Sequence, residues 1–160
     1  MKRSATIAVL LTRLSLTGLL LAGLLLACSL QEESSAQSAV FATERGAIDG
    51  ADPVAFFSEG TAVRGSLELW LDWNGARWHF DSERNRELFR SDPERYAPQF
   101  GGYCAYGVAS GYAVKSEPEA WSLLDGKLYL NYDLETRAEW SQDRSALIAQ
   151  AKKNWPGVLD

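Results

Sequence analysis

Downstream of residue 30, one thiol, one imidazole and a few carboxylates are the side chains best suited to chemistry. Cys104 lies among four glycines between residues 100 and 112, and His79 is the only histidine of the chain. Thiolate and imidazole are ligands of copper and zinc rather than of magnesium or calcium. A site built on one Cys and one His needs further ligands, and Asp49, Asp52 and Asp81 are the candidates. These five residues are a tentative site for a transition-metal ion, copper or zinc.

Each of these residues also has a structural interpretation. A lone cysteine such as Cys104 is often a small buried hydrophobe; otherwise it is a metal ligand, a redox-active thiol or half of an intermolecular disulfide. Asp52 precedes a proline and suits a helix N-cap, whereas Asp49 precedes a glycine and suits a turn. The sequence leaves these alternatives open.

Four aromatic residues are tentative pocket-lining residues: Tyr103, Tyr106 and Tyr112, which flank the glycines, and Trp70. Packing in the core is the alternative, because aromatic side chains supply much of the buried area of a small domain.

Several classes of protein are excluded or disfavoured. Cys104 and His79 could pair as nucleophile and base, but no third orienting residue or oxyanion-hole motif accompanies them, so we expect no enzyme. The glycine-rich segment lacks the Gly-Lys-Ser/Thr ending of a phosphate-binding loop. Two cysteines and one histidine cannot build an all-protein zinc finger. A formal net charge of −5 without a basic run argues against nucleic-acid binding.

Two hairpins are predicted from turn dipeptides. Asn74-Gly75 is a strong hairpin turn, and a two-residue loop there pairs Trp73 with Ala76, Leu71 with Trp78 and Leu69 with Phe80 on one face, the core side. The opposite face pairs Asp72 with Arg77 and Trp70 with His79, which predicts a surface histidine stacked on a tryptophan. The second turn is Asp125-Gly126, with the following residues on one face: Trp121, Leu123, Leu128, Leu130 and Tyr132.

Each hairpin is followed by a helical pattern. Asp81 and Ser82 can cap a helix over residues 83–90, and Pro93 opens a further turn through residue 96. Asp133 can cap one longer helix over residues 134–154, with these residues on its inner side: Ala138, Leu147, Ile148 and Ala151. The predicted fold class is α+β, with small antiparallel hairpins packed by helices and the hairpin–helix unit appearing twice.

The N-terminus has the pattern of an export signal. Lys2 and Arg3 near the start, and then Arg13, precede an apolar stretch over residues 14–27. This stretch is short for a spanning helix, although an uncleaved anchor is the alternative. The stretch ends in Leu25-Leu26-Ala27-Cys28, which resembles a bacterial lipobox and implies lipidation of Cys28. Ordinary cleavage after Ser29 or Ala36 is the other route. Cleavage before residue 28 removes three of the 16 basic residues and none of the 21 acidic ones, which leaves a formal charge of −8.

The chain beyond residue 45 resembles the YHS-domain family. The matching stretches are residues 49–57, 78–82, 92–107, 125–132 and 154–156, together with Asn85 and Phe89. It is most similar to exported bacterial YHS proteins, and the resemblance implies a small metal-associated module, found alone or attached to metal transporters and oxygenase-type enzymes. In transporter-attached members a cysteine follows Asp-Pro-Val; here that position is Ala55, so a multi-cysteine site is not implied.

The expected organisation is a lipoprotein-type signal peptide over residues 1–27, a flexible tether over residues 28–43 and a YHS-like domain over residues 44–157. The expected function is a metal-binding accessory module held by its N-terminal lipid on the periplasmic side of a bacterial membrane, with a metal-handling or redox protein as partner. A soluble periplasmic form, a thiol redox protein using Cys104 and a structural or interaction domain are the alternatives.

Overall fold

The computed structural model describes residues 37–160, so the predicted signal peptide, the lipidation of Cys28 and residues 28–36 of the tether lie outside the described part. Residues Ala36–Asp160 form one compact unit by their internal contacts. Within residues 37–160, no helix is long and apolar enough to span a bilayer.

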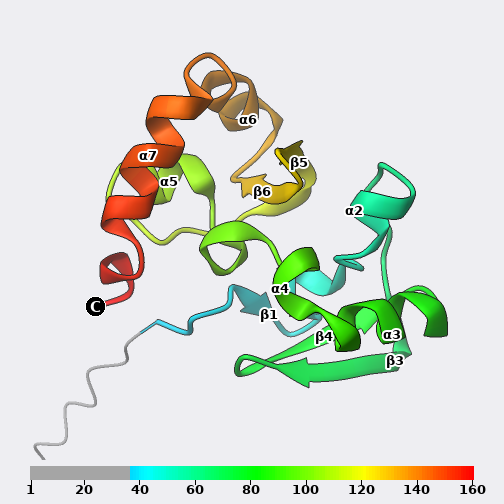
Figure 1. Cartoon of the computed structure of the whole chain (residues 1–160). Helices are drawn as coiled ribbons and strands as arrows, with labels where there is room; N and C mark the ends of the chain where they lie inside the picture. Colours follow the sequence, from blue (N-terminus) through cyan, green and yellow to red (C-terminus); the bar gives the residue numbers. More distant parts are fainter. Residues whose placement is uncertain (1–36) are drawn as a thin grey trace, which may run out of the picture. The chain divides into compact units, whose positions relative to one another are not determined.

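The fold is α+β and is built from short elements (Figure 1). The strands pair as three antiparallel hairpins: β1 (Ala42–Thr43) with β2 (Gly46–Ala47), β3 (Ser66–Trp73) with β4 (Ala76–Phe80), and β5 (Glu117–Leu124) with β6 (Lys127–Asn131). The α-helices are α2 (Ala55–Ser58), α3 (Glu83–Ser91), α4 (Pro93–Tyr96), α5 (Ala105–Ala109), α6 (Leu134–Trp140) and α7 (Arg144–Asn154). Three 3-10 turns complete the described chain: η1 (Ile48–Gly50), η2 (Gln99–Gly102) and η3 (Gly157–Leu159). The predicted hairpin–helix unit does occur twice, as β3–β4–α3 and β5–β6–α6, and the small β1–β2 hairpin was not predicted.

The first predicted hairpin is confirmed near its turn and wrong at its far end. Asn74 and Gly75 both have positive φ, as a two-residue hairpin turn of this kind requires. Trp73 lies opposite Ala76 and Leu71 opposite Trp78, as predicted. A register shift then intervenes, so that Ser66 rather than Leu69 lies opposite Phe80. The alternation of apolar residues cannot reveal such a bulge, because the extra residues loop out between two stretches of correct pairing.

Both faces of the second hairpin are buried, which gives the domain two hydrophobic clusters. The predicted register holds near the turn, with Trp121 opposite Leu130 and Leu123 opposite Leu128. Tyr132, predicted on the same face, instead follows the end of β6 and is 41% exposed. Leu128 and Leu130 belong to the first cluster, whereas Tyr129 points to the other face and belongs to the second. Strand β6 therefore divides the core.

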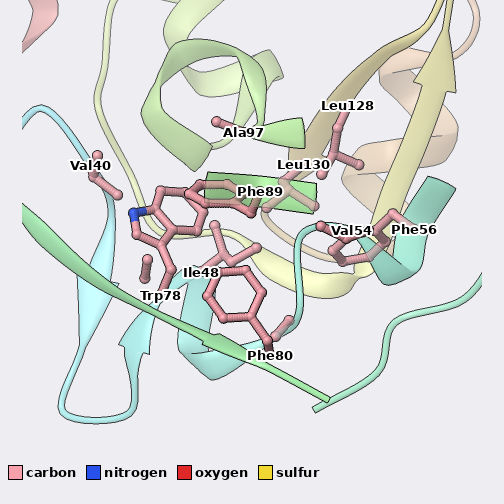
Figure 2. Close-up of a cluster of buried hydrophobic side chains, with 12 residues drawn as sticks. Val40, Ile48, Val54, Phe56, Trp78, Phe80, Phe89, Ala97, Leu128 and Leu130 are labelled. Atoms are coloured by element: carbon pink, nitrogen blue, oxygen red, sulfur yellow. The ribbon is translucent and has the colours of Figure 1, made fainter. Parts of the chain in front are cut away.

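The first cluster packs aromatic residues of β4 against α3 (Figure 2). Trp78, Phe80 and Phe89 are fully buried, and the ring centroids of Trp78 and Phe89 are 5.1 Å apart. The Trp78 indole Nε1 donates a hydrogen bond to the carbonyl oxygen of Trp73, 3.0 Å away. Ser82 caps α3 by accepting from the backbone N–H of Asn85, as the sequence predicts.

The single helix predicted after Asp133 is in fact two helices. Asp133 caps α6, but α6 ends at Trp140, and Asp143 provides a second cap for α7. Trp140 is fully buried in the second cluster, which fixes the position of the break, and Ala138 is exposed rather than on the inner side. Helix α7 packs against α5 through Ile148 and Ala151 (Figure 1).

Residues 37–43, predicted as the end of the tether, pack on the domain. The side chain of Val40 is 1% exposed. The backbone N–H of Gln37 donates to the carbonyl oxygen of Leu159, and that of Phe41 donates to Gly101. These residues therefore belong to the packed domain, which the sequence alone would start at residue 44.

Candidate functional site

His79 is paired with Trp70 across β3 and β4 as predicted, but it is not a surface residue. Only 6% of His79 is exposed, while 43% of Trp70 is exposed. The β1–β2 hairpin packs on β4 and covers the imidazole, and the guanidinium of Arg77, rather than His79, stacks on the Trp70 ring at 4.0 Å. The sequence could not place His79 correctly because nothing predicted the covering hairpin.

The His79 ring is oriented by a backbone contact. Its Nδ1 lies 3.1 Å from the carbonyl oxygen of Ser66. Since a carbonyl oxygen only accepts hydrogen bonds, Nδ1 carries the proton, and Nε2 keeps its lone pair in the neutral ring. This is the arrangement in which histidines commonly bind metal ions, with one nitrogen fixed by a backbone carbonyl and the other free to coordinate.

Gly46 packs closely against the Nε2 edge of the ring, where a side chain would not fit. A Cβ atom at this position would lie 3.1 Å from His79 Nε2 and 2.7 Å from the carbonyl oxygen of Arg77. Gly46 also has a φ of +103°, which disfavours any side chain. Both residues line a hollow of about 620 Å³ between the β1–β2 and β3–β4 hairpins, hereafter the His79 hollow.

Two carboxylates line the His79 hollow as well, Glu44 and Asp72. Glu44 is exposed in the turn between β1 and β2. Asp72 accepts from Arg77 Nε at 3.0 Å, and this hydrogen bond holds the pKa of Asp72 below its ordinary value. Asp72 is therefore ionised at neutral pH.

Cys104 occupies a structural position. It is 1% exposed, and its Sγ accepts from the backbone N–H of Gly107 at 3.3 Å, as the N-cap of α5. The amide oxygen of buried Asn131 lies 3.9 Å from Sγ. Burial raises the pKa of the Cys104 thiol, and the backbone hydrogen bonds oppose this only in part. The thiol is therefore neutral at pH 7 and closed off from solvent.

The carboxylate of Asp52 accepts hydrogen bonds from several segments of the domain. Asp52 is fully buried, and its carboxylate accepts from the backbone N–H groups of Val54 and Ala55, which confirms the predicted N-cap. It also accepts from the Asp81 backbone N–H at 2.9 Å and from Asn85 Nδ2 at 2.7 Å. Four donors occupy its two oxygens, so the carboxylate has little capacity left for a metal ion.

Neither Asp49 nor Asp81 forms a metal site with His79 or Cys104 in the described part of the chain. Asp49 lies in η1 and binds the guanidinium of Arg45, with Arg64 nearby. Burial alone would raise the pKa of Asp49, but the hydrogen bonds from Arg45 and Thr43 lower it overall. Asp81 is exposed at the start of α3. Among residues 37–160, no three His, Cys, Asp or Glu side chains are grouped as a metal site, so the five predicted residues are not brought together.

The four predicted pocket-lining aromatics are also dispersed. Tyr103 and Tyr106 pack in or against the second cluster, whereas Tyr112 is 66% exposed and Trp70 lies on the outer face of β3. The residues that sequence reasoning missed are Gly46 and Glu44, which flank His79. The only signal for them was the Glu44-Arg45-Gly46 turn, which carries no recognisable ligand pattern.

The family model of the YHS domain matches residues 54–100, which run from the residue before α2 into η2 and include β3, β4 and His79. Residues 54–100 are therefore similar to the YHS domain, a family regarded as one of metal-binding domains. Comparisons with curated proteins and with solved structures give no match.

Proposed function

We propose that this protein is a non-catalytic module that binds a transition-metal ion, copper or zinc, through His79 Nε2 in the His79 hollow. The observation that carries the proposal is the orientation of the imidazole, whose Nδ1 is held by Ser66 while Nε2 lies beside Gly46. Imidazole is a good ligand for both metals.

The remaining ligands would be Glu44, water or a group from a partner protein. Glu44 lies in a turn, so its side chain can adjust to a bound ion, whereas Asp72 is held by Arg77. A site with one fixed protein ligand binds weakly and exchanges its ion readily. This suits an accessory module that receives or hands on metal, with a metal-handling protein as its partner.

Cys104 is left out of this proposal. The thiolate is the form that binds metal and attacks disulfides, and burial of Cys104 with its raised pKa disfavours that form. The same facts argue against the alternative of a thiol redox protein. They favour the interpretation of Cys104 as a buried, structural thiol.

We further propose that the domain is exported and tethered to the periplasmic side of a bacterial membrane through a lipid on Cys28. Support comes from the basic start, the apolar stretch and the Leu-Leu-Ala-Cys ending, all in the sequence. A soluble periplasmic protein is the alternative if cleavage follows residue 29 or 36.

Metal binding can be tested through the one imidazole. In a titration of the domain with Zn²⁺, or with Cu²⁺, the single histidine Hε1 NMR signal should shift or broaden at stoichiometric metal. His79→Gln should abolish binding, Glu44→Gln should weaken it several-fold, and Cys104→Ser should leave it unchanged. Glu59→Gln, an exposed change outside the hollow, is the matched control.

Loss of binding in Cys104→Ser with retention in His79→Gln would contradict the proposed ligand. An unshifted imidazole signal, with no metal in elemental analysis of the protein purified from membranes, would contradict metal binding altogether.

A further inference from the structure

A second hollow, separate from His79, lies at the junction of the two hydrophobic clusters. We propose that it binds a small amphiphilic organic anion, a molecule with an aromatic-sized apolar body and one acidic group. The hollow has a volume of about 600 Å³, within the range of roughly 300–1,000 Å³ typical of small-molecule sites. It is hereafter the tryptophan hollow.

Four of the residues that line it are aromatic and come from distant parts of the chain. Trp73 and Trp78 of the first hairpin line one part, and Phe100 and Trp155 line another. The ring centroids are 5.9 Å apart in the first pair and 6.2 Å apart in the second. Trp73 and Trp155 are only half-buried, so each keeps ring surface available to a ligand. Aromatic walls bury a planar apolar group with a large gain in contact area.

The backbone at the base of the hollow is in an uncommon conformation. Phe100 has a φ of +56°, in the left-handed region that bulky residues rarely adopt. The next residue, Gly101, also has positive φ, and its lack of a side chain admits the close approach of Ala39. Uncommon backbone angles of this kind cluster at binding sites, because the surrounding structure must hold them in place.

The charge of the hollow is opposite to that of the protein. Lys127 at the start of β6 and Lys152 near the end of α7 both line it, and Glu94 is the one acidic residue among the described residues that line it. Among residues 37–160, neither lysine takes part in an ion pair. The charged residues that line the hollow thus sum to a net positive charge on a chain with a formal charge of −5, and the two lysines come from separate elements. This combination selects an anion with an apolar body over a neutral or cationic molecule.

Each lysine taken alone has an ordinary explanation. Lys152 lies in the last turn of α7, where a cation complements the helix dipole. Lys127 follows a hairpin turn, where a solvated charge is common. Neither explanation requires the two side chains to meet at the same aromatic hollow, and Lys153, which serves the dipole equally well, does not line it.

The test uses a pair of dyes that differ in charge. 8-Anilinonaphthalene-1-sulfonate is the anionic dye, and N-phenyl-1-naphthylamine is its uncharged counterpart. Titrated into the domain of residues 36–160, with circular dichroism to verify folding, the sulfonate should bind with 1:1 stoichiometry and about tenfold more tightly than the neutral dye, as two exposed charge pairs allow. Energy transfer from tryptophan to the dye should accompany binding.

Charge variants then locate the site. Lys127→Gln combined with Lys152→Gln should reduce the sulfonate affinity to that of the neutral dye, without changing the latter. Lys115→Gln combined with Lys153→Gln makes the same change in net charge outside the hollow and should change neither affinity. Equal weakening by both double variants, equal affinity for both dyes, or no binding by the folded domain would each overturn the proposal. These outcomes are independent of whether His79 binds metal.

Discussion

Among single residues, the buried Cys104 thiol and the buried Asp52 carboxylate both accept hydrogen bonds within the domain. Cys104 and Asp52 were both candidate metal ligands by type. Asp52 instead accepts from backbone N–H groups and from the Asn85 side chain, and buried Cys104 accepts from the backbone N–H of Gly107. His79 differs, because only one of its two ring nitrogens takes part in a hydrogen bond within the described residues. Residue type identified five candidates. Among residues 37–160, His79 is the buried candidate that keeps a coordinating atom without a hydrogen bond, whereas Asp81 is exposed and is not grouped with it.

We predict that Asp52→Ala destabilises the domain by about 3–5 kcal/mol, because it leaves Asn85 Nδ2 and buried backbone N–H groups without an acceptor. Asp81→Ala is the matched control. It keeps the backbone N–H that binds Asp52 and removes only an exposed side chain, so it should cost less than about 1 kcal/mol. Urea unfolding monitored by tryptophan fluorescence measures the stability of both variants. Similar losses of stability in the two would contradict the structural role of the Asp52 carboxylate.

Alkaline pH should destabilise the domain through its buried acids. Burial raises the pKa of Cys104 above its ordinary value of 9.0, so the unfolded chain releases the thiol proton at a lower pH than the folded chain does. The contribution of this thiol to the free energy of unfolding should then be constant below about pH 8 and fall as the pH rises through about 9. Tyr103 and Tyr129 act in the same direction from their ordinary value of 10.0, because burial also raises their pKa.

The thiol contribution can be isolated with Cys104→Ala. This variant should be less stable than the wild type at neutral pH, because it lacks the buried sulfur and its hydrogen bond from Gly107. Its stability should begin to fall only near about pH 10, where the two tyrosines titrate. Urea melts from about pH 7 to about pH 10.5 measure the difference, and parallel curves for the two proteins would contradict the pKa shift of Cys104.

At the scale of elements, the hairpins position the His79 hollow. The Asn74-Gly75 turn fixes the register of β3 and β4, and the register decides that Trp78 faces the core while Arg77 faces out. The β1–β2 hairpin then covers the outer face at His79. A slip of one residue would exchange the two faces and remove the hollow.

The register makes a direct prediction about stability. Trp78→Ala should cost about 3–5 kcal/mol, because it removes a fully buried indole that packs on Phe89. Arg77→Ala should cost less than about 1 kcal/mol, since its ion pair with Asp72 and its contact with Trp70 are exposed. Equal shifts in urea midpoint for these neighbouring residues would contradict the observed register.

In the whole molecule, the sequence joins an N-terminal segment that is basic and apolar to an acidic domain. Residues 36–160 form their own compact unit, and the residues at its start pack beside Gly101 and Leu159. The described part of the chain therefore begins beside its own C-terminal residues.

The proposed lipid tether can be tested through N-terminal cleavage and lipidation of the full chain. The intact mass of the protein extracted from membranes should correspond to a chain that begins at Cys28 and carries lipid, and Cys28→Ala should retain the precursor mass. A mature protein that begins at Leu30 or Gln37, after ordinary cleavage, would point to the soluble alternative. An N-terminus at Met1 would exclude both forms of cleavage.

The local features of this protein could be predicted from its sequence. Asn74-Gly75 and Asp125-Gly126 specify hairpin turns because positive φ is needed at both positions, and Ser82, Asp52 and Asp133 specify helix starts because their side chains accept from nearby backbone N–H groups. These features depend only on residues a few positions apart. The match to the family model over residues 54–100 likewise depends on the sequence alone.

Only the tertiary structure decided what surrounds each candidate residue. The bulge between Ser66 and Trp70, the break at Trp140 and the cover that β1–β2 places over His79 all depend on contacts between residues far apart in the chain. The tryptophan hollow likewise combines Trp73 with Trp155, which no local pattern connects. Burial and hydrogen-bond partners are properties of the packed chain, and they determine whether a thiol or imidazole is a structural group or a ligand.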